Sequence, residues 1–247
     1  MPEPTPLVLL HPFPMDASFW SEVAPRLAGE REVTAPEFPG FGKAPPVEGA
    51  TVDGFADLVA ERIAADMPGG RAAVCGLSLG GYAALSLAAR HPERVAGLVL
   101  ADTRAEPDTP EAAEGRRRAA ALVRESGPAA FLDEFVPRLV APGDEAGHDA
   151  ARTMADAQDP EAIATALEAL AGRADRRPDL PGIAAPALVI VGSEDLLTPV
   201  AFSETLVAGL PDAEMVVIPG AGHLSALERP AEFAAAVGPF LSRRVDA

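Results

Sequence analysis

The sequence predicts an α/β fold, in which a mostly parallel sheet of about six strands carries helices on both faces. Short apolar runs alternate along the chain with longer segments of helical periodicity. The apolar runs are continuous, as is typical of strands buried on both faces of a parallel sheet. A length of 247 residues and a hydrophobic content of 48% suit one domain with a large core.

Short runs rich in valine, leucine and isoleucine identify the strands. The clearest of them, at 187–191, is continuous and leads directly into Gly192. Strands are expected near residues 6–10, 31–35, 72–76, 96–101, 187–192 and 214–218.

Helices are expected between these strands, where apolar residues recur at helical spacing. Thr51 is a suitable N-cap for the second helix, and Pro230 suits the first turn of the last one. Helices are expected near residues 18–28, 52–67, 79–90, 199–209 and 230–243.

The stretch from Pro110 to Arg173 interrupts the alternation, because it is helical in pattern and carries no strand signal. It is rich in alanine, arginine and glutamate. We therefore expect a core formed by residues 1–102 and 181–247 and a helical insertion formed by residues 103–180.

The third expected strand ends in the pattern G-x-S-x-G, which places Ser78 between Gly76 and Gly80. A strand, this pattern and then a helix form the setting in which a serine sits on a sharp turn with its Oγ exposed. Glycine is needed on both sides because a Cβ would crowd the close approach of strand and helix. Taken alone, Ser78 could equally be a helix N-cap.

Two further polar residues follow the last two expected strands. Asp195 lies just past the strand at 187–192, and His223 lies on a glycine-rich loop after the strand at 214–218. Each could be an ordinary turn or loop residue. Placement of all three at strand ends by chance is improbable, so we predict that Ser78, Asp195 and His223 form a catalytic triad.

Two backbone N–H groups are expected to bind the oxyanion of a tetrahedral intermediate. One is that of Leu79, which follows the serine at the positive end of a helix. The other is that of Phe13, because Pro12 and Pro14 on the same loop have no N–H. The alternative is that this loop is only a proline-stiffened turn.

Taken together, these residues resemble the α/β-hydrolase superfamily, and most of all its small bacterial carboxylesterases, 3-oxoadipate enol-lactonases and cofactor-free haloperoxidases (perhydrolases). The resemblance covers nearly the whole chain, but Pro12 stands where the family usually has glycine. Glu37 and Ala44 replace the first acid and last serine of the family pattern D-x-P-G-x-G-x-S. The residues that carry the resemblance are His11 and Trp20, Glu37 to Gly42, Gly76 to Gly80, Gly192 to Asp195, and Gly222-His223.

The resemblance implies the α/β-hydrolase fold, with residues 103–180 as a helical cap over the pocket. The chain order Ser78, Asp195, His223 is the order of this family. Some members place the acid at the preceding strand end, where Asp102 stands, and we favour Asp195 because its position is the commoner one. His11 is expected to be structural.

The activity implied is that of a serine hydrolase, which cleaves small carboxylic esters through an acyl-enzyme. Alternatives are a lactonase, such as a 3-oxoadipate enol-lactonase, and a perhydrolase, in which Pro14 would set the direction of the Phe13 carbonyl. A non-catalytic binding protein on the same fold is a third alternative, and an intact triad argues against it.

Apolar residues near the expected site are assigned to the substrate pocket. An anionic lactone would also need an arginine there. The predicted pocket residues are Pro14, Phe131, Phe135, Leu139, Leu197 and Leu224. The candidate arginines are Arg104, Arg138 and Arg152.

A net charge of −17 argues against nucleic acid and anionic membrane surfaces as partners, so the expected partner is a small ester or lactone. No nucleotide motif or metal-ligand spacing is found, and no cofactor is expected. A short acidic start, Met1 to Pro4, and a single cysteine, Cys75, indicate a cytoplasmic protein without a signal peptide. The oligomeric state is left open.

Overall fold

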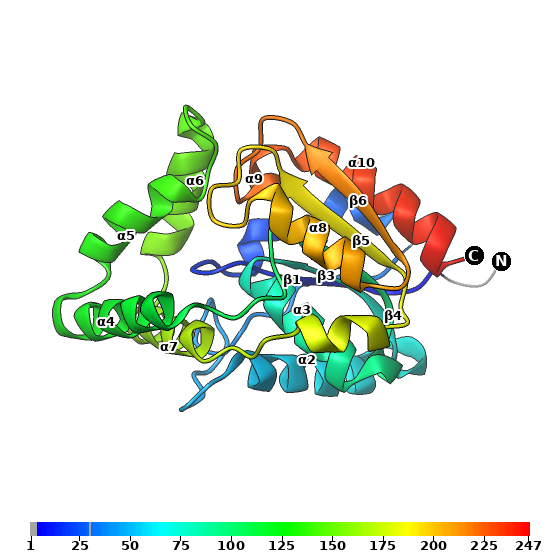
Figure 1. Ribbon diagram of the computed structural model, residues 1–247, viewed down its shortest axis with the longest axis horizontal. Helices are drawn as coiled ribbons and strands as arrows, with labels where there is room; N and C mark the ends of the chain where they lie inside the picture. Colours follow the sequence, from blue (N-terminus) through cyan, green and yellow to red (C-terminus); the bar gives the residue numbers. More distant parts are fainter. Residues whose placement is uncertain (1–3, 30) are drawn as a thin grey trace.

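The computed structural model describes residues 4–29 and 31–247, and its strands form one sheet in the order β2-β1-β3-β4-β5-β6 (Figure 1). Every pair of neighbouring strands is parallel. The predicted six-stranded α/β fold is thereby confirmed. Residues 1–3, part of the acidic start, lie outside the described residues. The strands are β1 (Leu7–Leu10), β2 (Val33–Thr34), β3 (Ala72–Leu77), β4 (Val95–Ala101), β5 (Ala187–Gly192) and β6 (Ala213–Ile218).

The central strands are buried on both faces, which explains their continuous apolar sequence. In β1, Leu7 and Leu9 pack into the core on one face of the sheet, while Val8 and Leu10 pack into the core on the other. Cys75 lies in β3 and is fully buried.

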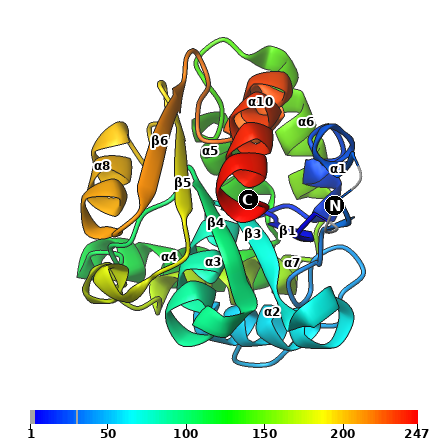
Figure 2. The ribbon, with the colours of Figure 1, turned by 90° about the vertical axis from the view of Figure 1, so that its right-hand side faces the viewer.

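Helices cover both faces of this sheet (Figure 2). The helices α2 (Val52–Asp66), α3 (Leu79–Arg90) and α8 (Val200–Gly209) cover one face, and α1 (Ala24–Ala28) and α10 (Pro230–Phe240) cover the other. In the described part of the chain, no helix is both long and apolar enough to cross a lipid bilayer.

The expected helix caps are present, but one expected helix is divided. Thr51 accepts a hydrogen bond from the N–H of Gly54 at 2.9 Å, and Pro230 lies in the first turn of α10. The prediction of a single helix at 18–28 is wrong, because the chain there forms a 3₁₀ turn and then α1. Pro25 has no N–H and would clash inside a helix, so it lies in the first turn of α1, which begins at Ala24.

Two other boundaries differ from expectation. The last α-helix ends at Phe240, and a π-helical turn, Leu241–Val245, continues it. Pro239 lies just before this turn and cannot donate the usual helical hydrogen bond. The strand expected at 31–35 is reduced to Val33–Thr34, which pairs only with β1.

Four α-helices lie between β4 and β5 and occupy one end of the molecule (Figure 1). The pair α4 and α7 pack together, and α5 contacts both α4 and α6. They are α4 (Pro110–Ser126), α5 (Ala129–Phe135), α6 (Glu145–Asp156) and α7 (Pro160–Ala171). We call them the helical insertion.

Candidate active site

Three residues that lie far apart in the sequence meet at the carboxyl edge of the sheet. Ser78 follows β3, Asp195 follows β5, and His223 follows β6. The imidazole Nε2 of His223 is 2.8 Å from Ser78 Oγ, and its Nδ1 is 2.9 Å from Asp195 Oδ2. The structure therefore brings the three residues of the predicted triad together in one chain of hydrogen bonds.

The turn that carries Ser78 is strained and closely packed. Ser78 has φ 53° and ψ −111°, which non-glycine residues rarely adopt. A Cβ on Gly76 would lie 2.1 Å from the carbonyl oxygen of Gly80, and one on Gly80 would lie 2.0 Å from that of Leu10. Glycine at both positions lets α3 start directly against the strands and keeps Ser78 at the apex of the turn.

Asp195 is held by its own turn as well as by the histidine. Its Oδ1 accepts the backbone N–H groups of Leu197 and Thr198 at 2.8 Å each. Its Oδ2 accepts the hydroxyl of Thr198 at 2.6 Å in addition to His223. Burial alone would raise the pKa of Asp195, but His223 and these donors outweigh it and lower the pKa to about 2. The carboxylate is therefore ionised at neutral pH.

A buried carboxylate also fixes the loop on both sides of His223. Glu228 accepts the N–H of Gly222 at 3.0 Å and that of Leu224 at 3.3 Å. It also accepts the N–H of Ala141, in the segment between α5 and α6, at 2.7 Å. Glu228 belongs to the short helix α9 (Ser225–Glu228), so it links α9, the His223 loop and the helical insertion.

Asp102, the alternative acid, lies close by but has other partners. It accepts the N–H of Gly192 at 2.8 Å and hydrogen bonds from the N–H and hydroxyl of Ser225. Burial and the charge of Asp195 raise the pKa of Asp102 well above its usual range. The imidazole of His223 hydrogen bonds to Asp195, so the geometry favours Asp195 as the acid.

The loop after β1 brings Phe13 to the same edge. No acceptor for the backbone N–H of Phe13 or Leu79 is found among residues 4–29 and 31–247. Leu79 opens α3, where helix N–H groups have no intrahelical acceptor. The Phe13–Pro14 peptide bond is cis. Both predicted oxyanion donors are thus unengaged.

His11 has a structural place behind this loop. Its Nε2 accepts the N–H of Phe38, and its Nδ1 donates to the carbonyl of Pro12, each at 3.0 Å. Burial lowers the pKa of His11 to about 4, so the ring is neutral at physiological pH. It joins the Phe13 loop to the segment at 37–42.

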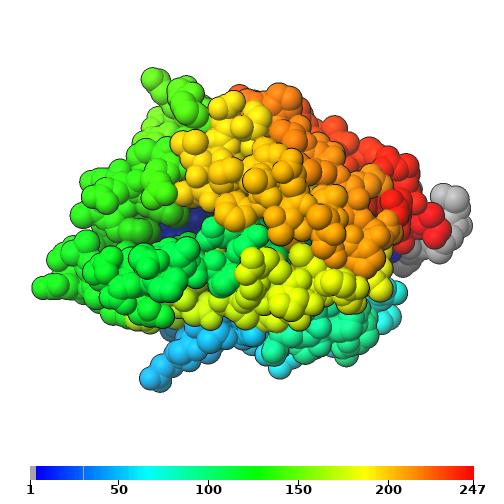
Figure 3. All heavy atoms as spheres, viewed as in Figure 1, coloured from blue at the N-terminus to red at the C-terminus, as the bar shows by residue number. Residues whose placement is uncertain are grey.

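A cavity of about 380 Å³ opens above Ser78 and His223. The space-filling view shows a hollow between the helical insertion and the segment after β5, with the N-terminal part of the chain visible at its base (Figure 3). The lining includes Phe13, Ser78, Tyr82, Arg104, Asp108, Arg116, Phe131, Phe135, Arg138, Leu167, Leu170, Leu197, Thr198 and His223.

Half of the predicted pocket residues line this cavity: Phe131, Phe135 and Leu197. The assignment of Leu139 and Leu224 is wrong, because both are fully buried and the Leu224 N–H donates to the Leu139 carbonyl. These two leucines join the insertion to the His223 loop.

The prediction that Pro14 lines the substrate pocket is also wrong. Phe13 is the residue of that loop that lines the cavity. Among the candidate arginines, Arg104 and Arg138 line the cavity. Arg152 instead pairs with Asp133 and Asp156 elsewhere on the insertion.

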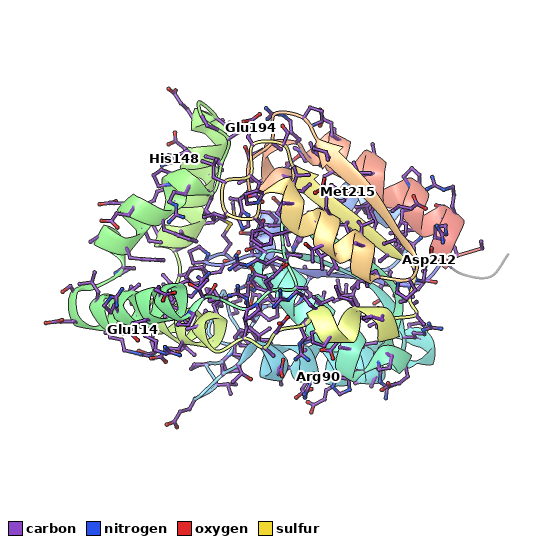
Figure 4. The ribbon with its side chains drawn as sticks, viewed as in Figure 1. Arg90, Glu114, His148, Glu194, Asp212 and Met215 are labelled. Carbon is purple, nitrogen blue, oxygen red and sulfur yellow. The ribbon has the colours of Figure 1, made fainter. Side chains whose placement is uncertain are left out.

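His148 is not among the residues that line this cavity. His148 lies on α6 and pairs with Asp149 at 3.4 Å (Figure 4). Within the described residues, no group of three or more His, Cys, Asp or Glu side chains could hold a metal ion.

Sequence reasoning missed Thr198, Glu228, Asp108 and Arg116. Thr198 lies in the turn after Asp195, where a hydroxyl is a common cap and gives no distinct signal. Glu228, Asp108 and Arg116 look like ordinary surface charges in the sequence. Their roles depend on contacts in three dimensions that a single sequence does not show.

The model of the alpha/beta hydrolase family matches residues 7–236. The chain belongs to this family. The fold, the strained serine turn and the order of the three site residues agree with that membership.

Individual relatives cover nearly the full chain. A pimeloyl-[acyl-carrier protein] methyl ester esterase of Aromatoleum aromaticum is 34% identical, over 92% of this chain and 94% of its own. The malate-bound structure of a thermophilic esterase from Thermogutta terrifontis has a TM-score of 0.92 at 35% identity, covering 98% of this chain and 90% of its own. An enol-lactonase structure from Burkholderia xenovorans has a TM-score of 0.85 at 30% identity, covering 97% and 92%.

Proposed function

We propose that the protein is a carboxylic ester hydrolase that cleaves small esters through an acyl-enzyme on Ser78. The observation that carries this proposal is the chain of hydrogen bonds from Ser78 through His223 to Asp195. Ser78 and His223 line the cavity, so a substrate there could reach the serine. Two relatives with more than nine-tenths coverage are esterases by name, which supports the same class of reaction.

In the first half of the reaction, Ser78 Oγ attacks the ester carbonyl while His223 Nε2 takes the hydroxyl proton. The N–H groups of Phe13 and Leu79 hold the oxyanion that forms, and removing one such donor typically costs about 3 kcal/mol. His223 then returns the proton to the departing alkoxide, which leaves as an alcohol. Asp195 stays ionised throughout and stabilises the imidazolium.

In the second half, a water molecule takes the place of the alcohol. His223 accepts a proton from this water, and the hydroxide adds to the acyl carbonyl. Collapse of the second intermediate breaks the bond to Ser78, whose oxygen regains a proton from His223. The products are one carboxylic acid and one alcohol.

Residues 103–180 serve in this proposal as a cap that walls the substrate pocket. Support comes from the cavity lining, to which α4, α5 and α7 contribute alongside the loops after β1, β3, β5 and β6. A lactone is a cyclic ester, so lactone hydrolysis at the same site is the second candidate, and the arginines in the cavity favour it when the lactone is anionic.

The test replaces Ser78 by Ala. We expect the variant to fold and to lose ester hydrolysis by several orders of magnitude, because the nucleophile is gone. A fluorophosphonate probe should label the parent protein at Ser78 and leave the variant unlabelled. Substantial turnover by Ser78→Ala, or no labelling of the parent, would contradict the proposal.

A further inference from the structure

The wall of the cavity that holds Ser78 and His223 carries an excess of positive charge. Arg104, Arg116 and Arg138 line it, together with a single carboxylate, Asp108. This is unexpected in a chain whose formal net charge is −17. The clustering of arginines at one cavity of such an acidic protein therefore needs an explanation at that site.

Asp108 cannot neutralise the cations around it. Its side chain is 1% exposed, and it contacts Arg104 Nη2 at 2.8 Å, Arg116 Nε at 2.5 Å and Arg173 Nη2 at 2.8 Å. Burial would raise the pKa of Asp108, but Arg116 and Arg173 outweigh it and hold the pKa below its usual value. One ionised carboxylate therefore faces three guanidinium groups.

Aromatic rings flank two of the three arginines that contact Asp108. The Arg104 guanidinium lies 4.9 Å from the ring centre of Phe202, and that of Arg173 lies 4.5 Å from the ring centre of Tyr82. The Nε atoms of both arginines are buried and have no hydrogen-bond partner among the described residues. Fixed, partly desolvated guanidinium groups bind carboxylates well because no ordering is needed on binding.

Acidic side chains near the cavity do not neutralise this excess of positive charge. Glu106 lies beside a separate, smaller cavity lined by Arg104 and Arg173, and it is not part of the wall that faces Ser78. Arg138 has no ion pair with another described residue, although Arg104 and Arg116 share Asp108. The cavity lining therefore keeps a net positive charge, from three arginines and one carboxylate.

We propose that this arginine-lined wall binds a carboxylate carried by the substrate itself. The inference rests on the proposed ester hydrolysis and specifies its substrate class. The preferred substrates are monoesters of dicarboxylic acids, in which Ser78 attacks the ester carbonyl while the arginines hold the distant negative charge.

The experiment compares monomethyl adipate with its uncharged counterpart dimethyl adipate, by release of methanol. The parent protein should show a higher kcat/KM for the monoester, and added salt should reduce the preference. Hydrolysis of neither ester would overturn the proposed function. Hydrolysis of dimethyl adipate without any preference for the anion would overturn only the present inference.

Two variants and a control locate the effect. In Arg104→Gln and Arg116→Gln, the ratio of kcat/KM for the monoester to that for the diester should fall about tenfold or more, as expected for loss of a charge-assisted contact. Arg152→Gln is the control, because Arg152 lies on the same insertion outside the cavity. It should leave the ratio unchanged.

The use of two cavity variants keeps the test valid if one of them does not fold. Arg116 lies on α4 and is 25% exposed, so Arg116→Gln keeps the test open if Arg104→Gln does not fold. Free adipate should inhibit dimethyl adipate hydrolysis competitively in the parent and more weakly in both variants. Equal ratios in parent and variants, or an equal fall in Arg152→Gln, would contradict the inference.

Discussion

At the scale of single residues, the site contains two carboxylates whose surroundings push their pKa values in opposite directions. Asp195 accepts hydrogen bonds from His223 and Thr198 and stays ionised, while the pKa of the fully buried Asp102 is raised. Opposite pKa shifts in two neighbouring acids typically mark different roles: an acid with a lowered pKa can stabilise an imidazolium, and one with a raised pKa can stay protonated. The two strand ends are neighbours, yet they shift the pKa values of these acids in opposite directions.

Replacing Asp195 by Asn should reduce kcat far more than replacing Asp102 by Asn. Loss of an equivalent acid costs about 10⁴ in rate, because the amide does not fix the required tautomer of the histidine. The measurement is kcat for one ester with both purified variants, after thermal melts show that they fold. A larger loss in Asp102→Asn would exchange the roles of the two acids.

The pH dependence should report the state of His223. Burial alone would lower the pKa of His223, but Asp195 outweighs it, and the pKa lies above its ordinary value of about 6.5. Only the neutral imidazole can accept the Ser78 proton, so kcat/KM should rise with pH and reach half its maximum above that value. The profile should shift to lower pH in Asp195→Asn; a midpoint that stays fixed would contradict this assignment.

At the scale of elements, the sequence predicts the strands well, because buried parallel strands have a continuous apolar sequence. The strand ends then place Ser78, Asp195 and His223 on one edge without any knowledge of side-chain contacts. Helix limits are harder to predict: α1 begins at Ala24, with Pro25 in its first turn, where periodicity suggested one longer helix. What periodicity cannot reveal is a contact such as that of Glu228 with Ala141, 87 residues away in sequence.

Replacing Glu228 by Gln should loosen the His223 loop. The loop N–H groups of Gly222 and Leu224 would lose an ionic acceptor, and a weakened buried hydrogen bond typically costs about 1–3 kcal/mol. We expect a lower melting temperature and a lower kcat, measured by calorimetry and ester hydrolysis. Glu232→Gln, at an exposed position of α10, is the matched control and should change neither.

At the scale of the whole molecule, the helical insertion and the core meet around the cavity, and this junction is the part that the sequence predicts least. Phe131 and Phe135 stack with their centroids 5.1 Å apart, and both rings contact Phe13. They stand four residues apart on α5, so both rings lie on the same face of that helix. Leu139 and Leu224 have the same apolar character but are fully buried. The sequence assigns them to the pocket because it does not distinguish a cavity wall from the core behind it.

Replacing Phe131 and Phe135 by Ala should change the preference among esters of different acyl length. The two rings wall the cavity but supply no reacting group, so acetate esters should be affected least. The measurement is kcat/KM across a series of p-nitrophenyl esters. Leu122→Ala, at a position of α4 that is 44% exposed, is the control. Equal losses at all acyl lengths would mean that the rings serve only in packing.

The burial of Cys75 in the middle of β3 has a practical consequence for measuring motion in this protein. It is the one cysteine of the sequence, and burial raises the pKa of its thiol, so the folded protein offers thiol reagents neither access nor a thiolate. A cysteine introduced on α4 or α5 would therefore take up a fluorophore at a single position without removal of the native one. Fluorescence from such a label would show whether the insertion moves during turnover, and delayed labelling of Cys75 itself would time the unfolding of the sheet.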